Sequence, residues 1–135
     1  MDILTVKKGI ICQQVNNRGV MGAGPALAIR QKWPIVYKEY LDRRLCLGEI
    51  LLVQVEPGLY VANLCTQEGF GRTGQYTDYN ALELCLKTLA IVAKSLSLSV
   101  YIPHRIGCGL AGGDWVGVVC PMIERILPTA IICRL

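Results

Sequence analysis

The sequence predicts an α/β fold in which helices cover both faces of a partly parallel sheet. Short β-branched runs alternate with helical stretches along the chain, and one pair of runs is spaced as an antiparallel hairpin. Apolar residues make up 53% of the chain and charged residues 18%, so a full hydrophobic core is expected. A length of 135 residues suits one compact domain, and we therefore expect a single domain over residues 1–135.

The first third of the chain predicts a strand, a loop and two helical pieces. Residues 9–15 form a β-branched run that ends in a polar, glycine-bearing loop. Pro25 can occupy the first position of the following helix, because that position needs no backbone N–H. Pro34 ends this helix. A second, shorter helical piece carries Tyr37 and Tyr40.

Two strands are predicted next, over residues 49–55 and 60–65. The turn between them contains Pro57, which presets φ, and Gly58, which accepts the left-handed conformation. We expect the two strands to pair as a hairpin.

A strongly periodic helix follows the hairpin and a polar loop. Thr77 or Asp78 is its expected N-cap. Its apolar stripe consists of Leu82, Cys85, Leu86, Leu89, Ala93 and Leu96. The rest of the chain predicts, in order, a strand at 99–103, a glycine-rich loop at 106–113, a helix at 115–126 and a strand at 129–133.

Charge and hydropathy limit the classes of partner. The net charge is +4, and the basic residues form scattered short pairs, so neither nucleic acid nor a membrane surface is the leading partner. The longest apolar stretch, residues 82–102, carries Glu83, Lys87 and Lys94, which argues against a membrane span. The N-terminus has no signal-peptide pattern, and a cytoplasmic location is expected.

The cysteine pattern predicts buried thiols in a reducing compartment. Seven cysteines are present, an odd number, and no C-x-x-C spacing occurs. His104 is the only histidine, so no metal site is expected. As a residue at a strand end, His104 is favoured to be structural rather than catalytic.

Two glycine-rich loops, residues 19–24 and 106–113, each follow a predicted strand and precede a predicted helix. Ligands of open α/β sheets bind at the carboxyl ends of strands, and bare N–H groups at a helix start favour an anion. Two such loops in one small domain indicate a ligand with more than one phosphate. The alternative is that the glycines only tighten turns.

Familiar nucleotide motifs do not explain these loops. Residues 107–112 match G-x-G-x-x-G, but residues 127–132 lack the acidic partner that a dinucleotide-binding fold needs. Neither loop ends in Gly-Lys-Ser/Thr, which disfavours triphosphate hydrolysis with magnesium. The glycines are therefore compatible with a nicotinamide dinucleotide oxidoreductase, but the missing acidic residue is not. Cys108 could act as a thiolate, but a buried small thiol is favoured.

Three polar side chains near the loops could bear chemistry. Asp114 could cap the helix that follows it, or orient a water or a ribose hydroxyl, and these roles are compatible. Asn16 and Asn17 could simply turn the chain, or hold a sugar hydroxyl.

Four segments of the chain resemble a known family. They begin with Asp2-Ile3-Leu4 and continue with GIICQQVNNRGVMGAGPALAIRQKWP, NLCTQEGFGRTGQYTDYNAL and IPHRIGCGLAGGDW. Together they resemble the macro domains of the bacterial and phage type, often labelled ADP-ribose-1″-phosphate processing proteins. The resemblance implies a three-layer α/β/α fold with a central mixed sheet that binds ADP-ribose in a cleft above the sheet. Compared with the family, the chain is expected to lack the usual first strand.

The resemblance also implies roles for individual residues. Asp2 is similar to the acidic residue that accepts a hydrogen bond from the adenine amine, and Asn16 to the asparagine that contacts the distal ribose. Asp114 falls near an acidic position of hydrolytic members. The implied diphosphate-binding residues are Gly19, Val20, Met21, Gly22, Ala23 and Gly24 in the first loop and Gly107, Cys108, Gly109, Leu110 and Ala111 in the second.

Two departures from the family leave its activity open. Gln13 stands where the phosphatase branch has a histidine, and glutamine cannot transfer protons near neutral pH. Gln67 stands where the branch that removes ADP-ribose from acidic side chains or DNA bases has a lysine. Three hypotheses therefore remain: a reader of ADP-ribose, a hydrolase of a phosphate or acyl ester on the distal ribose with Asp114 as its catalytic residue, and an ADP-ribosyl hydrolase. None of them requires a metal or a cofactor.

Overall fold

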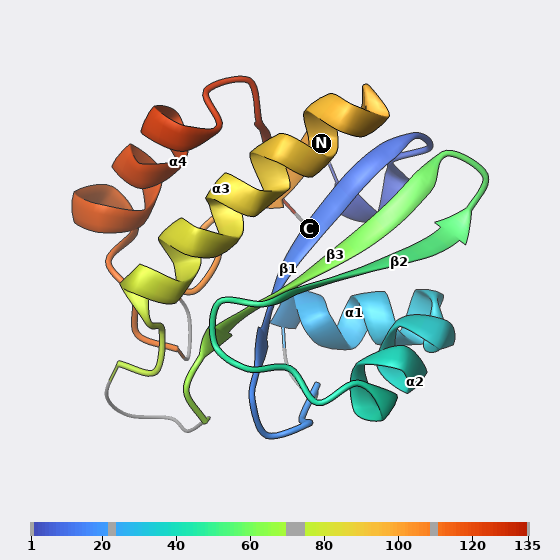
Figure 1. Cartoon of the computed structure of the whole chain (residues 1–135), viewed down its shortest axis with the longest axis horizontal. Helices are drawn as coiled ribbons and strands as arrows, with labels where there is room; N and C mark the ends of the chain where they lie inside the picture. The colour runs from blue at the N-terminus through green and yellow to red at the C-terminus, as the bar shows by residue number, and fades with distance from the viewer. Residues whose placement is uncertain (1, 22–23, 70–74, 109–110, 135) are drawn as a thin grey trace.

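A mixed sheet forms the centre of the molecule (Figure 1). In the computed structural model, which describes residues 2–21, 24–69, 75–108 and 111–134, five strands pair in the order β2-β3-β1-β4-β5. The strands are β1 (Gly9–Asn16), β2 (Ile50–Glu56), β3 (Leu59–Gln67), β4 (Val100–Pro103) and β5 (Ile131–Cys133). Strand β2 runs antiparallel to β3, and the other pairs are parallel. The expected hairpin and mixed sheet are both confirmed.

Two helical layers enclose the sheet, as Figure 1 shows. Helices α1 (Gly24–Lys32) and α2 (Pro34–Asp42) cover one face, and α3 (Tyr79–Leu96) and α4 (Cys120–Ile126) cover the other. Strand β1 contributes to both cores, because successive side chains of a strand point to opposite faces. Ile11 packs toward α1 and α2, and Ile10 packs toward α3 and α4. The three-layer α/β/α fold is therefore confirmed.

Of the two expected N-caps of helix α3, the structure uses the second, Asp78. The Asp78 carboxylate, rather than Thr77, caps the helix by accepting a 2.9 Å hydrogen bond from the Ala81 N–H. The expected apolar stripe is buried except at its end, where Leu96 is 40% exposed. Leu96 is the last helical residue, and the left-handed backbone of Ser97 then turns the chain away.

The predicted helix at 115–126 is divided into two parts. A π-helical turn, η2 (Trp115–Val119), precedes the α-helix α4. Pro121 explains the division, because proline has no N–H to donate and its ring would clash with the Gly117 carbonyl in a continuous α-helix. The wider π turn removes this conflict, and the Cys120 N–H bonds to the Trp115 carbonyl.

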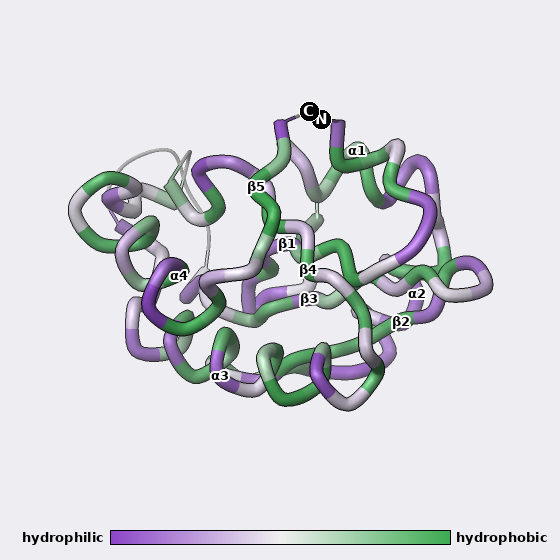
Figure 2. Tube along the Cα trace, turned by 90° about the horizontal axis from the view of Figure 1, so that it is seen from above, coloured by the Kyte–Doolittle hydropathy of each residue, from purple (hydrophilic) through white to green (hydrophobic). Residues whose placement is uncertain are grey.

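The two ends of the described chain lie side by side (Figure 2). Asp2 forms a parallel bridge with Arg134, directly after β5, and then begins a short 3-10 helix, η1 (Ile3–Thr5). Because β5 is parallel to β4 and β1, this bridge places Asp2 at the carboxyl edge of the sheet. Within residues 2–8 the structure contains no strand before β1.

The cysteines are mostly buried thiols, as predicted. All seven are free; five are buried, Cys46 is exposed and Cys120 is half-buried. Burial raises the pKa of Cys65 to about 11 and that of Cys85 to about 12, so both are protonated at neutral pH. In the described part of the chain, no helix has the length and apolar character needed to cross a membrane.

Candidate functional site

Two loops leave the sheet where two neighbouring parallel strands end, and we call the space between these loops the crevice. Strands β1 and β4 pair directly, so the segments that follow them emerge at the same edge of the sheet. We name these segments loop 1 (residues 17–23) and loop 2 (residues 104–114). Loop 1 leads to α1 on one face and loop 2 leads to α4 on the other. Such a topological switch point is where open α/β sheets bind ligands.

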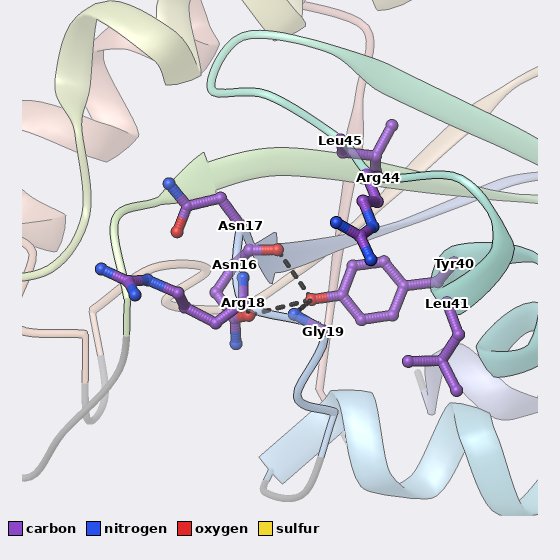
Figure 3. Close-up of a pocket in the computed structure, with 8 residues that line it drawn as sticks. All are labelled: Asn16, Asn17, Arg18, Gly19, Tyr40, Leu41, Arg44 and Leu45. Carbon is purple, nitrogen blue, oxygen red and sulfur yellow. Dashed lines mark hydrogen bonds between the residues drawn. The ribbon is translucent and has the colours of Figure 1, made fainter.

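Loop 1 is shaped by Asn16 and Tyr40 (Figure 3). The Asn16 Oδ1 accepts hydrogen bonds from the backbone N–H of Arg18 at 2.9 Å and of Val20 at 3.3 Å, while Nδ2 donates to the Val20 carbonyl at 2.8 Å. The Tyr40 hydroxyl lies 2.7 Å from the Asn16 carbonyl and 2.9 Å from its Oδ1, and it accepts from the Gly19 N–H at 3.1 Å. The Asn16 side chain therefore fixes the conformation of loop 1, and Tyr40 of α2 holds both Asn16 and Gly19 in place.

The buried Tyr40 hydroxyl should make stability sensitive to alkaline pH. Burial raises the pKa of Tyr40 from 10.0 to about 12. Because the folded-state pKa is the higher one, the stability that the neutral hydroxyl contributes is complete below about pH 10 and is lost as the pH rises toward 12. The difference between the tyrosinate absorbance titrations of the wild type and Tyr40→Phe should show one group that ionises near pH 12. A midpoint near pH 10 would show that this hydroxyl is not buried in solution.

Asn17 joins loop 1 to the end of β3. Its Nδ2 donates to the Glu68 carboxylate at 3.1 Å, and its Oδ1 accepts from the Gly69 N–H at 3.0 Å. The Asn17 N–H also donates to the Gln67 carbonyl at 3.2 Å. Gln67 thus lies at the carboxyl end of β3, directly beside loop 1.

Loop 2 is held by a buried threonine. The Thr77 hydroxyl donates to the Gly107 carbonyl at 2.7 Å and accepts from Gln14 Nε2 at 3.0 Å. The same carbonyl accepts from the Gly113 N–H at 2.9 Å, which closes the base of the loop. Thr77 is 3% exposed, so this contact is shielded from water. Strand β1 therefore reaches loop 2 through Gln14 and Thr77.

One hollow lies between loop 1 and the segments that contain Glu68, Gly69 and Tyr76. The Ala111 carbonyl of loop 2 accepts hydrogen bonds from the N–H groups of Tyr76 and Thr77 at 2.6 and 3.2 Å. Tyr76 in turn lines a cavity of about 590 Å³ together with Val20 of loop 1. The other residues that line it are Arg18, Glu68 and Gly69. The two loops are thus connected through the residues that flank this cavity.

Cys108 has the environment of a structural thiol. It is 5% exposed, and its Sγ donates to the Ile106 carbonyl at 3.3 Å. Burial raises the pKa of Cys108 to about 11, and the nearby Arg105 only partly offsets this. The buried-thiol interpretation is confirmed, and the thiol is protonated at neutral pH.

Asp114 caps the helix that follows loop 2. Its Oδ1 accepts a 2.9 Å hydrogen bond from the Gly117 N–H, and its own N–H donates to the Tyr79 hydroxyl at 2.9 Å. The side chain is exposed at the rim of loop 2. The capping role is therefore confirmed, and the catalytic role stays a prediction.

Two substitutions of Asp114 separate the stability that its helix cap contributes from the stability that its negative charge contributes. Asp114→Ala should lower the free energy of unfolding by about 1 kcal/mol, whereas Asp114→Asn should change it by only a few tenths, because asparagine caps nearly as well as aspartate. Urea denaturation of both variants measures the difference. Equal losses would mean that the charge, and not the cap, is what stabilises η2.

Gln13 and His104, two further residues considered in the sequence analysis, both pack against neighbouring side chains. Gln13 is 1% exposed and faces the α1 layer, where its Nε2 lies 2.5 Å from the Asn63 Oδ1 and 3.9 Å from the Met21 sulfur. No described residue bonds its Oε1. The His104 ring packs edge-on against Trp115 with ring centres 5.2 Å apart, and its structural role stays a prediction.

The remaining predicted ligand residues are distributed as follows. The Asp2 Oδ1 caps η1 by accepting from the Leu4 N–H at 2.9 Å. Met21 is buried against the core, and Gly24 begins α1. Gly22, Ala23, Gly109 and Leu110 lie outside the described residues. Within the described ranges, no three histidine, cysteine or acidic residues group in a way that could hold a metal ion.

Sequence reasoning missed three residues that shape the site: Gln14, Tyr40 and Thr77. Gln14 had no signal beyond its place two positions before Asn16, and Tyr40 was noted only as a residue of a predicted helical piece. Thr77 was considered as a helix cap, and its actual partner is the carbonyl of a residue 30 positions away.

The fold and the crevice define a class: an α/β protein with two amide-rich loops at a switch point of its sheet. No protein-family model matches the chain, and a comparison with curated proteins finds no match. Solved structures do match. A protein of unknown function from Bacteroides thetaiotaomicron is 33% identical, with a TM-score of 0.87, over 100% of this chain and 94% of that one.

A macrodomain protein from Streptomyces coelicolor is 30% identical, with a TM-score of 0.80, over 100% of this chain and 95% of that one. The chain belongs to the macrodomain family. DarTG of Thermosipho africanus, solved in complex with ADP-ribose, has the same fold at 21% identity and a TM-score of 0.76, over 94% of this chain and 37% of that one.

Proposed function

We propose that the protein binds ADP-ribose, or a close derivative, with its diphosphate between loop 1 and loop 2. The observation that carries this proposal is the pairing of β1 with β4, which brings both loops to one edge of the sheet. Backbone N–H groups of the loops, together with the start of α1, supply the partial positive charge that a diphosphate needs. Membership of the macrodomain family and the ADP-ribose complex of a protein with this fold support the same ligand.

The rest of the ligand can be assigned along the carboxyl edge of the sheet. Asp2, bridged to the end of β5, is our candidate for the adenine amine. The distal ribose then lies toward β3, in the cavity of about 590 Å³. Asn16 Nδ2 uses one proton in its bond to Val20, and its second proton is available for a ribose hydroxyl.

Titration calorimetry with ADP-ribose tests this proposal. We expect saturable one-to-one binding with low-micromolar or tighter affinity, and a higher melting temperature in the presence of the ligand. Asp114→Asn should bind equally well, because Asp114 has no part in holding the diphosphate. A protein that neither releases heat nor gains thermal stability with ADP-ribose would rule out binding in the crevice.

A second candidate function is hydrolysis of a phosphate or acyl ester on the distal ribose. It rests on Asp114, an exposed carboxylate at the rim of loop 2 whose Oδ1 is engaged in the cap, so that Oδ2 could orient a water. Phosphate release from ADP-ribose-1″-phosphate should then fall about 100-fold in Asp114→Asn, which keeps the cap. Release at an unchanged rate would leave Asp114 as a cap alone.

The third candidate, removal of ADP-ribose from protein or DNA, lacks its usual nucleophile. Gln67 stands at that position and cannot form the covalent intermediate that a lysine forms. A Gln67→Lys variant that gained this activity would show that the crevice admits such substrates and lacks only the amine.

A further inference from the structure

A second cavity, of about 420 Å³, lies on the α2 side of loop 1 (Figure 3). Its lining combines loop 1 with the end of α2 and the segment after it: Asn16, Asn17, Arg18, Gly19, Tyr40, Leu41, Arg44 and Leu45. Small-molecule sites typically enclose about 300–1,000 Å³. The space is therefore large enough for a small organic group rather than only for water.

The charged groups that line this cavity are all cationic. Arg18 and Arg44 are the two basic residues that line it, and no acidic residue lines it. The ten acidic side chains of the chain all lie in the described ranges, and neither arginine is within 4.0 Å of any of them. In Figure 3, Arg44 reaches toward the Tyr40 ring, while Arg18 extends away from it.

The surrounding sequence holds the whole net charge of the protein. Residues 18–44, which run from Arg18 of loop 1 through α1 and α2, contain six basic and two acidic residues, whereas the rest of the chain contains eight of each. Two of the short basic pairs, Arg30 with Lys32 and Arg43 with Arg44, thus lie on the side of the sheet that α1 and α2 cover. A field of this sign raises the local concentration of anions at the cavity.

The lining also has an apolar part. Leu45 is buried, Leu41 is 47% exposed, and the Tyr40 ring lies beside Arg44. A guanidinium binds phosphate through two parallel N–H donors, and an apolar wall suits a flat or aliphatic group attached to that phosphate. The lining therefore favours an organic phosphate over a bare anion.

We propose that this cavity is a second ligand site, in which Arg44 binds the phosphate of a nucleotide-sized organic phosphate. Arg18 also lines the cavity of about 590 Å³ that we assign to the distal ribose, so the two sites adjoin at Arg18. The adjacency to ADP-ribose rests on the proposed function; the phosphate site itself does not. The phosphate can come from a free nucleotide or from a nucleotide within a phosphodiester chain.

Calorimetry with two probes, thymidine 5′-monophosphate and the dinucleotide pTpT, tests the site. Titrations are run with the crevice saturated by ADP-ribose and again without ADP-ribose. We expect saturable binding of at least one probe, weakened about tenfold or more by Arg44→Gln, as the loss of a charge-assisted phosphate contact predicts. The matched control is Arg43→Gln, which removes the same charge from the adjacent residue, outside the cavity lining. It should change the affinity less than about twofold.

The two probes identify the source of the phosphate: tighter binding of the monophosphate indicates a free nucleotide, and tighter binding of pTpT indicates a chain. Equal losses in Arg43→Gln and Arg44→Gln would overturn the proposal in favour of a diffuse field, and so would absence of saturable binding in the wild type. If ADP-ribose itself does not bind but a probe binds through Arg44, the proposed function fails and the second site stands. If ADP-ribose binds and neither probe does, the second site alone fails.

Discussion

Gly113→Ala should abolish measurable ADP-ribose binding, with a loss of affinity of about 100-fold or more. A Cβ at this position would lie 2.5 Å from the Gly107 carbonyl oxygen and 3.3 Å from the Cys108 sulfur. The Gly107 carbonyl accepts hydrogen bonds from the Thr77 hydroxyl and the Gly113 N–H. It therefore cannot move away from the new Cβ without breaking the bonds that fix loop 2. We expect a loss of stability of about 1–3 kcal/mol, as for other overpacked sites. Calorimetry and urea denaturation measure the two effects.

Gly58→Ala is the control for this substitution. Gly58 has a φ of 73° in the turn between β2 and β3, away from both loops, and alanine in this left-handed conformation should cost about 1–2 kcal/mol. Its ADP-ribose affinity should equal that of the wild type. If Gly113→Ala also keeps wild-type affinity, loop 2 does not hold the ligand.

Tyr40→Phe should weaken ADP-ribose binding about tenfold through loop 1. The substitution leaves the ring in place but removes the hydroxyl that bonds the Asn16 carbonyl and the Gly19 N–H. Buried groups that lose a partner cost about 1–3 kcal/mol, and a loop that is no longer held must be ordered when the ligand binds. Calorimetry should show the weaker affinity, and the unfolding transition should shift to lower urea concentration.

Tyr60→Phe is the matched control, because Tyr60 lies near the start of β3, at the end of the strand remote from loop 1. It should leave ADP-ribose affinity unchanged. Equal affinities in the two variants would mean that Tyr40 supports the fold without shaping the ligand site.

The fold could be read from the sequence because its local signals agree with its tertiary contacts. The β-branched run at β1, the Pro-Gly turn of the hairpin and the stripe of α3 each predicted the element that forms. The signals failed at two positions, one in the backbone and one in burial. Pro121 converts the first turn of the last helix to a π turn, and Leu96 falls on the apolar stripe but beyond the edge of the core.

The candidate site was less accessible to sequence reasoning, because its supports come from distant parts of the chain. The glycines of both loops are visible in the sequence, and their position at one edge of the sheet follows from the pairing of β1 with β4. The contacts that hold them are different: Tyr40 reaches Asn16 from the helix α2, and Thr77 reaches Gly107 across 30 residues. No spacing rule predicts such contacts, since they depend on how the layers pack.

The central claim is that both loops grip one ligand, and backbone amide NMR during an ADP-ribose titration tests it most directly. The amides of residues 18–21 in loop 1 and of Gly107 and residues 111–113 in loop 2 should shift together and fit one dissociation constant. Shifts confined to one loop, or located at neither, would contradict the claim.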